Sequence, residues 1–276
     1  MAANSAAAGP GPGEFVRSRR PGVPGVAEVL RARFTRHAYP MHTHDTWTVL
    51  LVDEGAVDYG LERHRHAGDR SAVTVLPPHV AHDGRAATPE GFRKRVVYLE
   101  PDALPAAAAG FFAGAPALGD PRAWTAVSAL HEAASRPGEE FEAAGRAALV
   151  VDALRSRAAG GPEPARHEDS PLARRLRELL DEHVVDGIAL ADAAALLGAS
   201  TAHLVRAFGH HHGLPPHAYL TARRVDLARR LLLAGTRPAE AAARAGFHDQ
   251  SHLTRHFRRV LGTTPARFAG VVRAGA

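Results

Sequence analysis

The sequence predicts an α+β protein with an N-terminal β-barrel, a helical segment after the barrel, and an all-α C-terminal domain. Three observations carry this prediction. Short β-rich runs bounded by glycine and proline occupy residues 26–100, which is typical of a barrel or sandwich. Apolar residues recur at helical spacing from residue 170 onward. Within that helical part a stretch of sequence is repeated, which indicates that one supersecondary unit occurs twice.

Length and composition narrow the class of protein. The chain has 276 residues, enough for one large domain or two ordinary ones. It has no cysteine, which excludes disulfides, thiol nucleophiles and cysteine-ligated zinc. It has no run of about 18 apolar residues, and its N-terminus lacks the basic start and apolar core of a secretory signal. We therefore expect a soluble, cytoplasmic protein without a membrane span.

Two segments rich in glycine and proline divide the chain. The first lies within residues 1–25, which cannot bury enough apolar surface to offset their chain entropy, so we expect a disordered tail there. The second lies near residue 160 and has the composition of an exposed linker. The sequence therefore predicts a first domain at 26–158, a linker at 159–169 and a second domain at 170–276.

Charge differs between the two parts of the chain. Residues 170–276 contain 15 arginines against 8 acidic residues, a net charge of +7. Residues 1–169 contain 19 basic and 21 acidic residues, a net charge of −2. A basic part joined to a nearly neutral one indicates a nucleic-acid-binding module attached to a domain with another task.

Three β-rich runs define the strands of the first domain. They are Trp47–Val52, Ala72–Leu76 and Phe92–Leu99, and the first two end at turn-forming residues. Short strands at regular spacing with glycine and proline turns predict a β-sandwich or barrel.

Residues 121–158 change to helical spacing and predict two amphipathic helices. Trp124, Val127 and Leu130 mark one face of the first, and Leu149 and Leu154 belong to the second. Two such helices after a barrel either pair with a second copy of the chain or pack back on the barrel. The sequence leaves both arrangements open.

The second domain contains a repeat with the pattern of a helix-turn-helix. His203–Phe208 aligns with His252–Phe257, an offset of 252 − 203 = 49 residues. Each copy has an alanine-rich stretch, then a glycine (Gly198 or Gly246), then a second helical stretch. A plain helical hairpin explains one copy, but two copies on a basic segment favour two DNA-binding units.

The second copy and the residues after it carry a specific motif: Gly246-Phe247, Leu253, Phe257, Gly262 and Pro265. A long helix predicted from Pro216 to Leu233 joins the two copies. With these features, the stretch from Leu172 to Phe268 closely resembles the DNA-binding domain of the AraC/XylS family of transcription regulators. The resemblance implies that each unit reads DNA bases with its second helix.

At the positions that match the family's base-reading residues, this chain has Thr201, Ala202, Val205, Arg206, Gln250, Ser251, His252 and Arg255. Their chemistry supports the assignment. Arginine can donate to guanine O6 and N7, glutamine can pair with adenine, and apolar side chains can touch a thymine methyl. We expect four further arginines at phosphates, which position a protein without specifying sequence: Arg223, Arg224, Arg258 and Arg259.

Histidines flank the first predicted strand of the N-terminal domain. His42 and His44 stand at i and i+2, so on an extended chain they point the same way. His82 follows 82 − 44 = 38 residues later, after a pair of prolines. With Trp47 beside them, these residues are candidates for a binding pocket.

The spacing around these histidines resembles the cupin barrel that serves the same family as an effector-binding domain, over roughly residues 26–100. The resemblance rests on Pro40, His42, His44, Gly55, Gly68, Pro78, His82 and Gly84. It implies a site for a small-molecule effector, and we expect that site to contain His42, His44, Trp47 and His82.

A metal is the alternative occupant of this site. Three histidines from separate strands can form a metal-binding face. Metal-binding cupins usually add a glutamate after the paired histidines, and Thr48 occupies the nearest place here. We therefore expect no metal cofactor, with a metal at His42, His44 and His82 as the less favoured reading.

These features together predict a cytoplasmic, sequence-specific transcription regulator that responds to a small-molecule effector and is not an enzyme. We expect it to bind double-stranded promoter DNA as a homodimer and to contact RNA polymerase. One alternative is a metal-dependent cupin enzyme with a helical appendage. Another is a DNA-binding protein whose barrel only dimerises. The sequence gives neither the effector, nor the operator, nor the sign of regulation.

Overall fold

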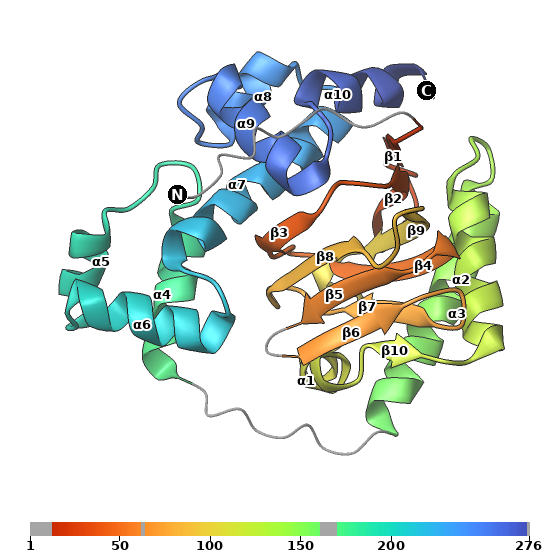
Figure 1. Ribbon diagram of the computed structural model, residues 1–276, viewed down its shortest axis with the longest axis horizontal. Helices are drawn as coiled ribbons and strands as arrows, with labels where there is room; N and C mark the ends of the chain where they lie inside the picture. Colours follow the sequence, from red (N-terminus) through yellow and green to blue (C-terminus); the bar gives the residue numbers. More distant parts are fainter. Residues whose placement is uncertain (1–12, 62–63, 161–169, 275–276) are drawn as a thin grey trace.

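The computed structural model describes residues 13–61, 64–160 and 170–274. Figure 1 shows a β-barrel with two helices, α2 and α3, along its outer flank. Helices α4–α10 lie on the other side and over one end of the barrel, and the long helix α7 runs diagonally between α4–α6 and α8–α10. The two predicted parts of the chain are therefore packed against each other.

Two antiparallel sheets form the barrel, with strand orders β1-β2-β9-β4-β7-β10 and β3-β8-β5-β6. The strands are β1 (Phe15–Arg19), β2 (Val26–Phe34), β3 (Tyr39–His42), β4 (Trp47–Gly55), β5 (Val57–Leu61), β6 (His64–Gly68), β7 (Val73–Leu76), β8 (His82–Ala86), β9 (Phe92–Leu99) and β10 (Ala117–Leu118). The three strands predicted from sequence are confirmed as β4, β7 and β9. Strand β2 is as long as β4, but Glu28, Arg31 and Arg33 interrupt its apolar residues. The other strands that were not predicted are only two to five residues long.

The larger sheet is buried on both faces because its strands alternate apolar residues toward two different cores. In β4, Trp47, Val49 and Leu51 belong to the core under the helices. Leu50 and Val52 belong to the core between the two sheets. A strand covered on both sides reads as a continuous apolar run, which explains the sequence of β4.

Helices α2 (Pro121–Ala134) and α3 (Glu140–Ala159) pack back on the barrel, together with α1 (Ala107–Gly114) and a short 3-10 turn (Pro101–Ala103). Asp120 caps α2 by accepting a hydrogen bond from the backbone N–H of Arg122. One face of α3 stays exposed, with Phe141 95% and Leu149 72% accessible. Within the described residues, packing on the barrel therefore leaves two large apolar side chains of α3 exposed.

The expectation of a disordered tail over residues 1–25 is wrong for its second half. Strand β1 pairs with β2 from Phe15 to Arg19. The Glu14 carboxylate accepts hydrogen bonds from the backbone N–H groups of Thr35 and Arg36. Residues 14–20 contain neither glycine nor proline, so this stretch between the two Gly/Pro-rich segments can form an edge strand. Residues 1–12 lie outside the described part of the chain, as do residues 161–169 of the expected linker.

Seven helices form the C-terminal domain within the described residues. They are α4 (Pro171–Glu182), α5 (Leu190–Leu197), α6 (Thr201–His212), α7 (Pro216–Leu233), α8 (Pro238–Arg244), α9 (Gln250–Leu261) and α10 (Pro265–Ala274). Two apolar clusters hold them together. The first surrounds Leu204, Phe208 and Tyr219, and the second surrounds Phe257 and Phe268.

The sequence repeat corresponds to two helix-turn-helix units, α5–α6 and α8–α9. Gly198 and Gly246 both adopt positive φ in the turns, 64° and 77°, a conformation that favours glycine. Ser200 and Asp249 cap the second helix of each unit by accepting a backbone hydrogen bond. Helix α7 joins the units with the bounds predicted from sequence.

The C-terminal domain docks on the barrel through three elements. Helices α7 and α9 contact β3, and α10 contacts β1. No helix in the described part of the chain is both long enough and apolar enough to cross a membrane.

Candidate DNA-reading face and sensor cavity

Helix α9 presents a polar, exposed face. Gln250, Ser251, Thr254, Arg255 and Arg258 line a shallow surface hollow along this helix. Its opposite face is buried through Leu253 and Phe257. The sequence prediction omitted Thr254, although the repeat pairs it with Val205, which was included. That pairing was the sequence signal that could have identified Thr254.

His252 differs from its neighbours on α9. Its ring packs edge-on against Phe247 and His256, with ring centroids 5.3 and 4.9 Å apart. Its Nδ1 accepts a hydrogen bond from the backbone N–H of His248 at 3.4 Å. The structure therefore places His252 at the margin of the hollow rather than in it.

Helix α6 offers a similar but less polar face. Thr201, Ala202 and Arg206 are exposed and Val205 is half-buried, while Leu204 and Phe208 face the core. The four predicted reading residues thus lie on the surface of α6. Among these four residues, only Arg206 has a long side chain that can donate hydrogen bonds.

The expectation that Arg223 and Arg224 contact phosphates is wrong for this conformation. Arg223 Nε lies 2.9 Å from Asp181 Oδ1, and its Nη1 lies 3.3 Å from Asp45 Oδ2. Arg224 donates to the backbone carbonyls of Val184 and Val185 at 2.6 and 3.2 Å. Long-range partners that no local pattern reveals already hold both guanidinium groups.

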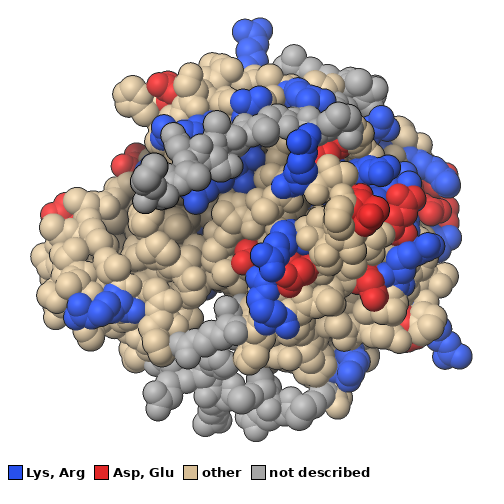
Figure 2. All heavy atoms as spheres, in the orientation of Figure 1, with Lys and Arg blue, Asp and Glu red and all other residues tan. Residues whose placement is uncertain are grey.

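Arg258 and Arg259 are exposed on α9, in keeping with a phosphate role. Figure 2 shows basic side chains gathered where α8–α10 lie in Figure 1, and acidic side chains mixed with basic ones over the barrel. The asymmetry of charge in the sequence is therefore also an asymmetry of surface.

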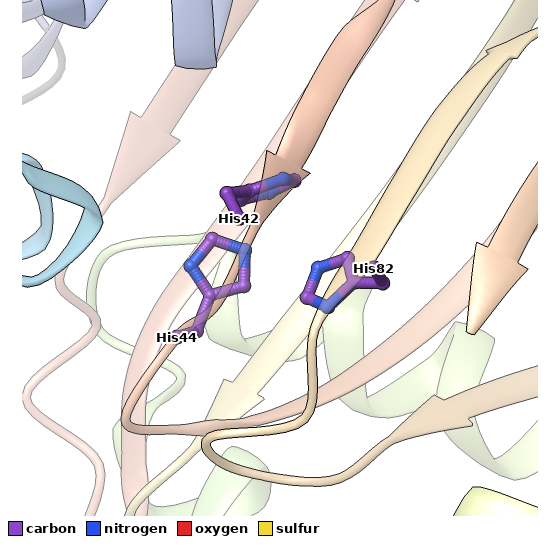
Figure 3. Close-up of side chains that lie close together, drawn as sticks. All are labelled: His42, His44 and His82. Carbon is purple, nitrogen blue, oxygen red and sulfur yellow. The ribbon is translucent and has the colours of Figure 1, made fainter. Parts of the chain in front are cut away.

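His42, His44 and His82 meet in the barrel, as the sequence predicted. His42 ends β3, His44 follows in the loop to β4, and His82 opens β8, where it pairs with His42 across the sheet. Figure 3 shows the three rings turned toward one another. One ring nitrogen from each lies within 4.8 Å of the other two, and all three side chains are buried.

Two of these histidines have a defined tautomer. His42 Nδ1 lies 2.7 Å from the Pro40 carbonyl oxygen, and His82 Nδ1 lies 3.0 Å from that of Val80. A carbonyl only accepts, so each Nδ1 carries the hydrogen and each Nε2 keeps a free lone pair. Burial lowers the pKa of His82 to about 4 and that of His42 and His44 well below the ordinary value. All three rings are therefore neutral near pH 7.

Trp47 does not belong to this site, contrary to expectation. Its ring lies in the core under the helices, edge-on to Phe112, and its Nε1 donates to the Pro101 carbonyl at 3.2 Å. Side chains alternate along β4, so Thr48 faces the cavity and Trp47 faces away. Both faces of this strand are apolar in sequence, so the sequence did not show which face lies against the helices and which faces the cavity.

The cavity beside the histidines is small and largely apolar. Its volume is about 60 Å³, and its apolar wall includes Leu30, Leu50, Leu76 and Phe92. Leu261, at the end of α9, also lines the cavity. The C-terminal domain therefore contributes to the wall of the barrel cavity.

Lys94, the one lysine of the chain, also lines this cavity and was not singled out from the sequence. Its side chain is buried, and its ammonium nitrogen lies 4.2 Å from the centroid of the Tyr39 ring. No acidic side chain forms an ion pair with it in the described part of the chain. Burial and the nearby Arg229 lower its pKa to about 7.

Buried ion pairs connect the sensor to α7. Arg229 Nη2 lies 2.6 Å from Glu28 Oε2, and its guanidinium lies 4.0 Å from the centroid of the Tyr98 ring. Asp226 Oδ2 accepts from the backbone N–H of Asp45 at 3.3 Å, and Asp226 Oδ1 lies 3.8 Å from His44 Nδ1. Isolated charged residues on a helix gave no sequence signal that they would pair across domains.

The fold and these two sites define a class of protein: a DNA-binding regulator whose helix-turn-helix pair is packed on a ligand-binding barrel. Comparison with known families agrees. The family of the AraC-like ligand binding domain matches residues 24–198, and a helix-turn-helix domain family matches residues 193–270. The chain belongs to the AraC family of DNA-binding transcription regulators.

Individual relatives are distant. The regulator YbfI of Bacillus subtilis is 38% identical over 86 residues, which are 31% of this chain and 31% of YbfI. The activator RhaS of Salmonella schwarzengrund is 25% identical over 263 residues, covering 86% of this chain and 89% of RhaS. Among solved structures, ToxT of Vibrio cholerae with a bound unsaturated fatty acid matches with a TM-score of 0.55 at 11% identity, covering 93% of this chain and 94% of ToxT. The aligned stretch spans about a third of YbfI, and the likeness to ToxT is one of fold.

Proposed function

We propose that this protein regulates transcription by reading two successive major grooves of promoter DNA with α6 and α9, under the control of an effector bound in the barrel. The observation that carries the proposal is the pair of capped helix-turn-helix units, each with an exposed polar face. In our proposal Thr201, Ala202, Val205 and Arg206 read one groove. Gln250, Ser251, His252, Thr254 and Arg255 read the other.

The length of α7 supports two grooves on one face of the duplex. Its 18 residues span about 27 Å at 1.5 Å per residue. Successive major grooves on one face lie ~34 Å apart. The widths of the two units make up the difference. One chain would therefore recognise a non-palindromic site with two blocks about ten base pairs apart.

The barrel, in this proposal, senses a ligand rather than catalysing a reaction. The cavity holds about 60 Å³ and is lined in part by Leu261 from the DNA-binding domain. A wall shared with α9 gives a ligand direct access to the DNA-reading helix. A cavity wall shared with a DNA-binding helix has no role in a cupin enzyme that carries a helical appendage. Metal-dependent turnover by the purified protein would favour that enzyme instead.

We further propose that the protein is a homodimer that uses the exposed face of α3. Phe141 and Leu149 lie on one side of that helix, with Gly145, Ala148 and Ala153 exposed between and beyond them. Small residues between two large apolar ones let a second helix approach closely.

A regulator at a promoter would also meet RNA polymerase, and it would act in the cytoplasm, where bacterial DNA lies.

Selection of DNA from a random library by the full-length protein tests the proposal. We expect enriched fragments with two conserved blocks about ten base pairs apart. The double variant Arg206→Ala/Arg255→Ala is expected to enrich no motif. Matched control arginines lie on the barrel surface, and Arg93→Ala is expected to reproduce the wild-type motif. Enrichment of no motif by the wild-type protein would contradict sequence-specific recognition.

A further inference from the structure

The three histidines of the barrel are arranged more closely than a general ligand pocket requires. Their ring centroids are 4.8 Å apart for His42 and His44, 4.4 Å for His42 and His82, and 5.1 Å for His44 and His82. Each side chain is more than nine-tenths buried. Three imidazole rings thus converge from β3, from the loop after it and from β8 (Figure 3).

The hydrogen bonds behind the rings match those of metal ligands. A metal-binding histidine almost always donates its second ring N–H to a carbonyl or carboxylate, which fixes the tautomer and aims the other nitrogen. His42 and His82 donate in this way to backbone carbonyls. His44 Nδ1 lies 3.8 Å from Asp226 Oδ1, beyond hydrogen-bond distance. Hydrogen bonds outside the cluster therefore orient two of the three rings, those of His42 and His82, as metal ligands.

The size of the cavity also favours a metal ion over an organic ligand. Pockets for organic ligands usually measure about 300–1,000 Å³. The cavity here measures about 60 Å³, which is room for an ion with a few water molecules. An organic effector would have to push apart a wall that includes Leu261, whereas a metal ion fits within the space that exists.

We propose that His42, His44 and His82 bind a divalent transition-metal ion, and that His44 couples the occupied site to helix α7 through Asp226. This proposal rests on the proposed function, because it names the class of effector that the sensor detects. It reverses our expectation from sequence of a barrel without metal.

The donor set suits zinc-type chemistry. Imidazole nitrogens bind zinc and its neighbours at ~2.0–2.1 Å, and three protein ligands leave an open fourth position. Tetrahedral bonds of that length place the nitrogens about 3.4 Å apart. The nitrogens now lie within 4.8 Å of one another, so binding would contract the cluster by no more than 4.8 − 3.4 = 1.4 Å. The buried Lys94 ammonium on the same cavity would favour an anion, such as hydroxide or a small carboxylate, at the open position.

This contraction supplies the link to the DNA-binding domain. His44 is followed by Asp45, whose backbone N–H donates to Asp226 and whose carboxylate pairs with Arg223 and Arg230 of α7. Movement of His44 toward the other two rings therefore displaces the contacts that hold α7. Helix α7 lies between the two reading units, so their placement changes with the occupancy of the cluster.

Titration of the full-length protein with Co²⁺ tests the site directly. We expect one equivalent per chain, with the visible absorption bands of tetrahedral Co²⁺, displaced by Zn²⁺. His42→Ala and the more conservative His82→Gln are expected to lower the affinity at least 100-fold, with circular dichroism confirming the fold. The control His211→Ala, in the histidine tract at the end of α6, is expected to bind normally. Wild-type affinity in both His42→Ala and His82→Gln, or no uptake by the wild-type protein, would overturn the site.

The coupling is tested by DNA affinity with and without Zn²⁺. We expect the wild-type affinity to change at least five-fold, a typical allosteric factor. Asp226→Asn is expected to lower metal affinity about ten-fold and to abolish the DNA response at saturating Zn²⁺. A smaller change in the wild-type protein overturns the coupling while leaving the site. Metal uptake without sequence-specific DNA binding in any state would contradict the proposed function and not the metal site.

Discussion

Several histidines of this protein are held neutral by burial, and His131 in α2 is a clear case outside the two sites. Its side chain is 1% exposed, and its Nε2 lies 3.1 Å from the Leu30 carbonyl oxygen. Burial, reinforced by Arg31, lowers its pKa to about 3. The unfolded chain binds a proton at this residue near pH 6.5, whereas the folded chain does not until the pH is far lower.

We therefore expect the stability of the protein to fall as the pH is lowered from about 6.5 toward 3. Protonation of His131 in the unfolded chain lowers the free energy of unfolding by about 1.4 kcal/mol at pH 5.5 relative to pH 7.5. Chemical denaturation of the wild type and of His131→Gln at both pH values measures this. The loss between the two pH values should be smaller in the variant by about that amount, and equal losses would show that His131 is not the group responsible.

Arg255 and Arg258 lie on the same exposed face of α9, and their roles at DNA should differ. Arg255 is expected to read bases, so Arg255→Ala should cost ~1–3 kcal/mol and relax preference at one or two positions of one block. Arg258 is expected to contact phosphate, so Arg258→Ala should weaken all sequences alike and lower the salt slope by about one.

Binding of both variants to a randomised-site library at two salt concentrations separates these roles. If Arg255→Ala weakens every sequence equally, Arg255 is a phosphate contact. In that case the assignment of the reading residues on α9 is wrong.

At the scale of elements, the two helix-turn-helix units use the same turn in different surroundings. Both turn glycines have positive φ, which costs any other residue about 1–2 kcal/mol. A Cβ on Gly198 would meet nothing within 4 Å. A Cβ on Gly246 would lie 2.3 Å from the Val185 carbonyl oxygen and 3.0 Å from Arg224 Nε.

Gly198→Ala should therefore cost about 1 kcal/mol of unfolding free energy, and Gly246→Ala at least twice as much. Urea denaturation of the two variants measures the difference. Both variants lose the same free energy from the positive φ. The additional loss in Gly246→Ala therefore measures the steric conflict with the Val185 carbonyl. Equal losses would mean that the loop after α4 moves away from the turn at little cost.

The exposed face of α3 leads to a prediction about assembly. If Phe141 and Leu149 pack against a second copy, Leu149→Glu places a charge in an apolar contact and should convert a dimer into a chain of 29.2 kDa. Analytical ultracentrifugation gives the mass. The control Arg122→Glu, exposed on α2, should stay dimeric. A monomeric wild-type protein at micromolar concentration would exclude this interface.

At the scale of the whole molecule, buried ion pairs cross between the two domains beside a small number of apolar contacts. The apolar clusters of the C-terminal domain are built almost entirely from its own residues, with Val16, Met41 and Ala81 as the contributions from the barrel. The pairs between Arg229 and Glu28 and between Arg223 and Asp45 cross the interface. Such an interface suits domains that change their relative position.

A fragment of residues 170–276 should therefore fold alone and bind DNA. Its affinity should be lower than that of the full-length protein if the α3 dimer brings two copies to one promoter. Circular dichroism and a DNA-binding titration test this. A fragment without helical signal would show that the barrel completes the core of the second domain.

The sequence by itself determined the local architecture and much of the sites. Periodicity identified β4, β7, β9 and the paired helices, because the spacing of apolar residues within each segment is typical of its conformation. The repeat located both helix-turn-helix units, and the spacing of His42 and His44 predicted that their rings would lie in the same site. These are properties of neighbouring residues, and short-range geometry is enough to read them.

Only the tertiary structure decided which partners those residues meet. Trp47 and Thr48 sit in one apolar run, and only packing between two cores assigned Trp47 to the helices and Thr48 to the cavity. Arg223 is an ordinary helix arginine until Asp45 and Asp181 approach it from distant parts of the chain. Leu261 became a wall of the sensor cavity in the same way. Contacts between residues far apart in the chain depend on how whole elements dock, which local spacing does not encode.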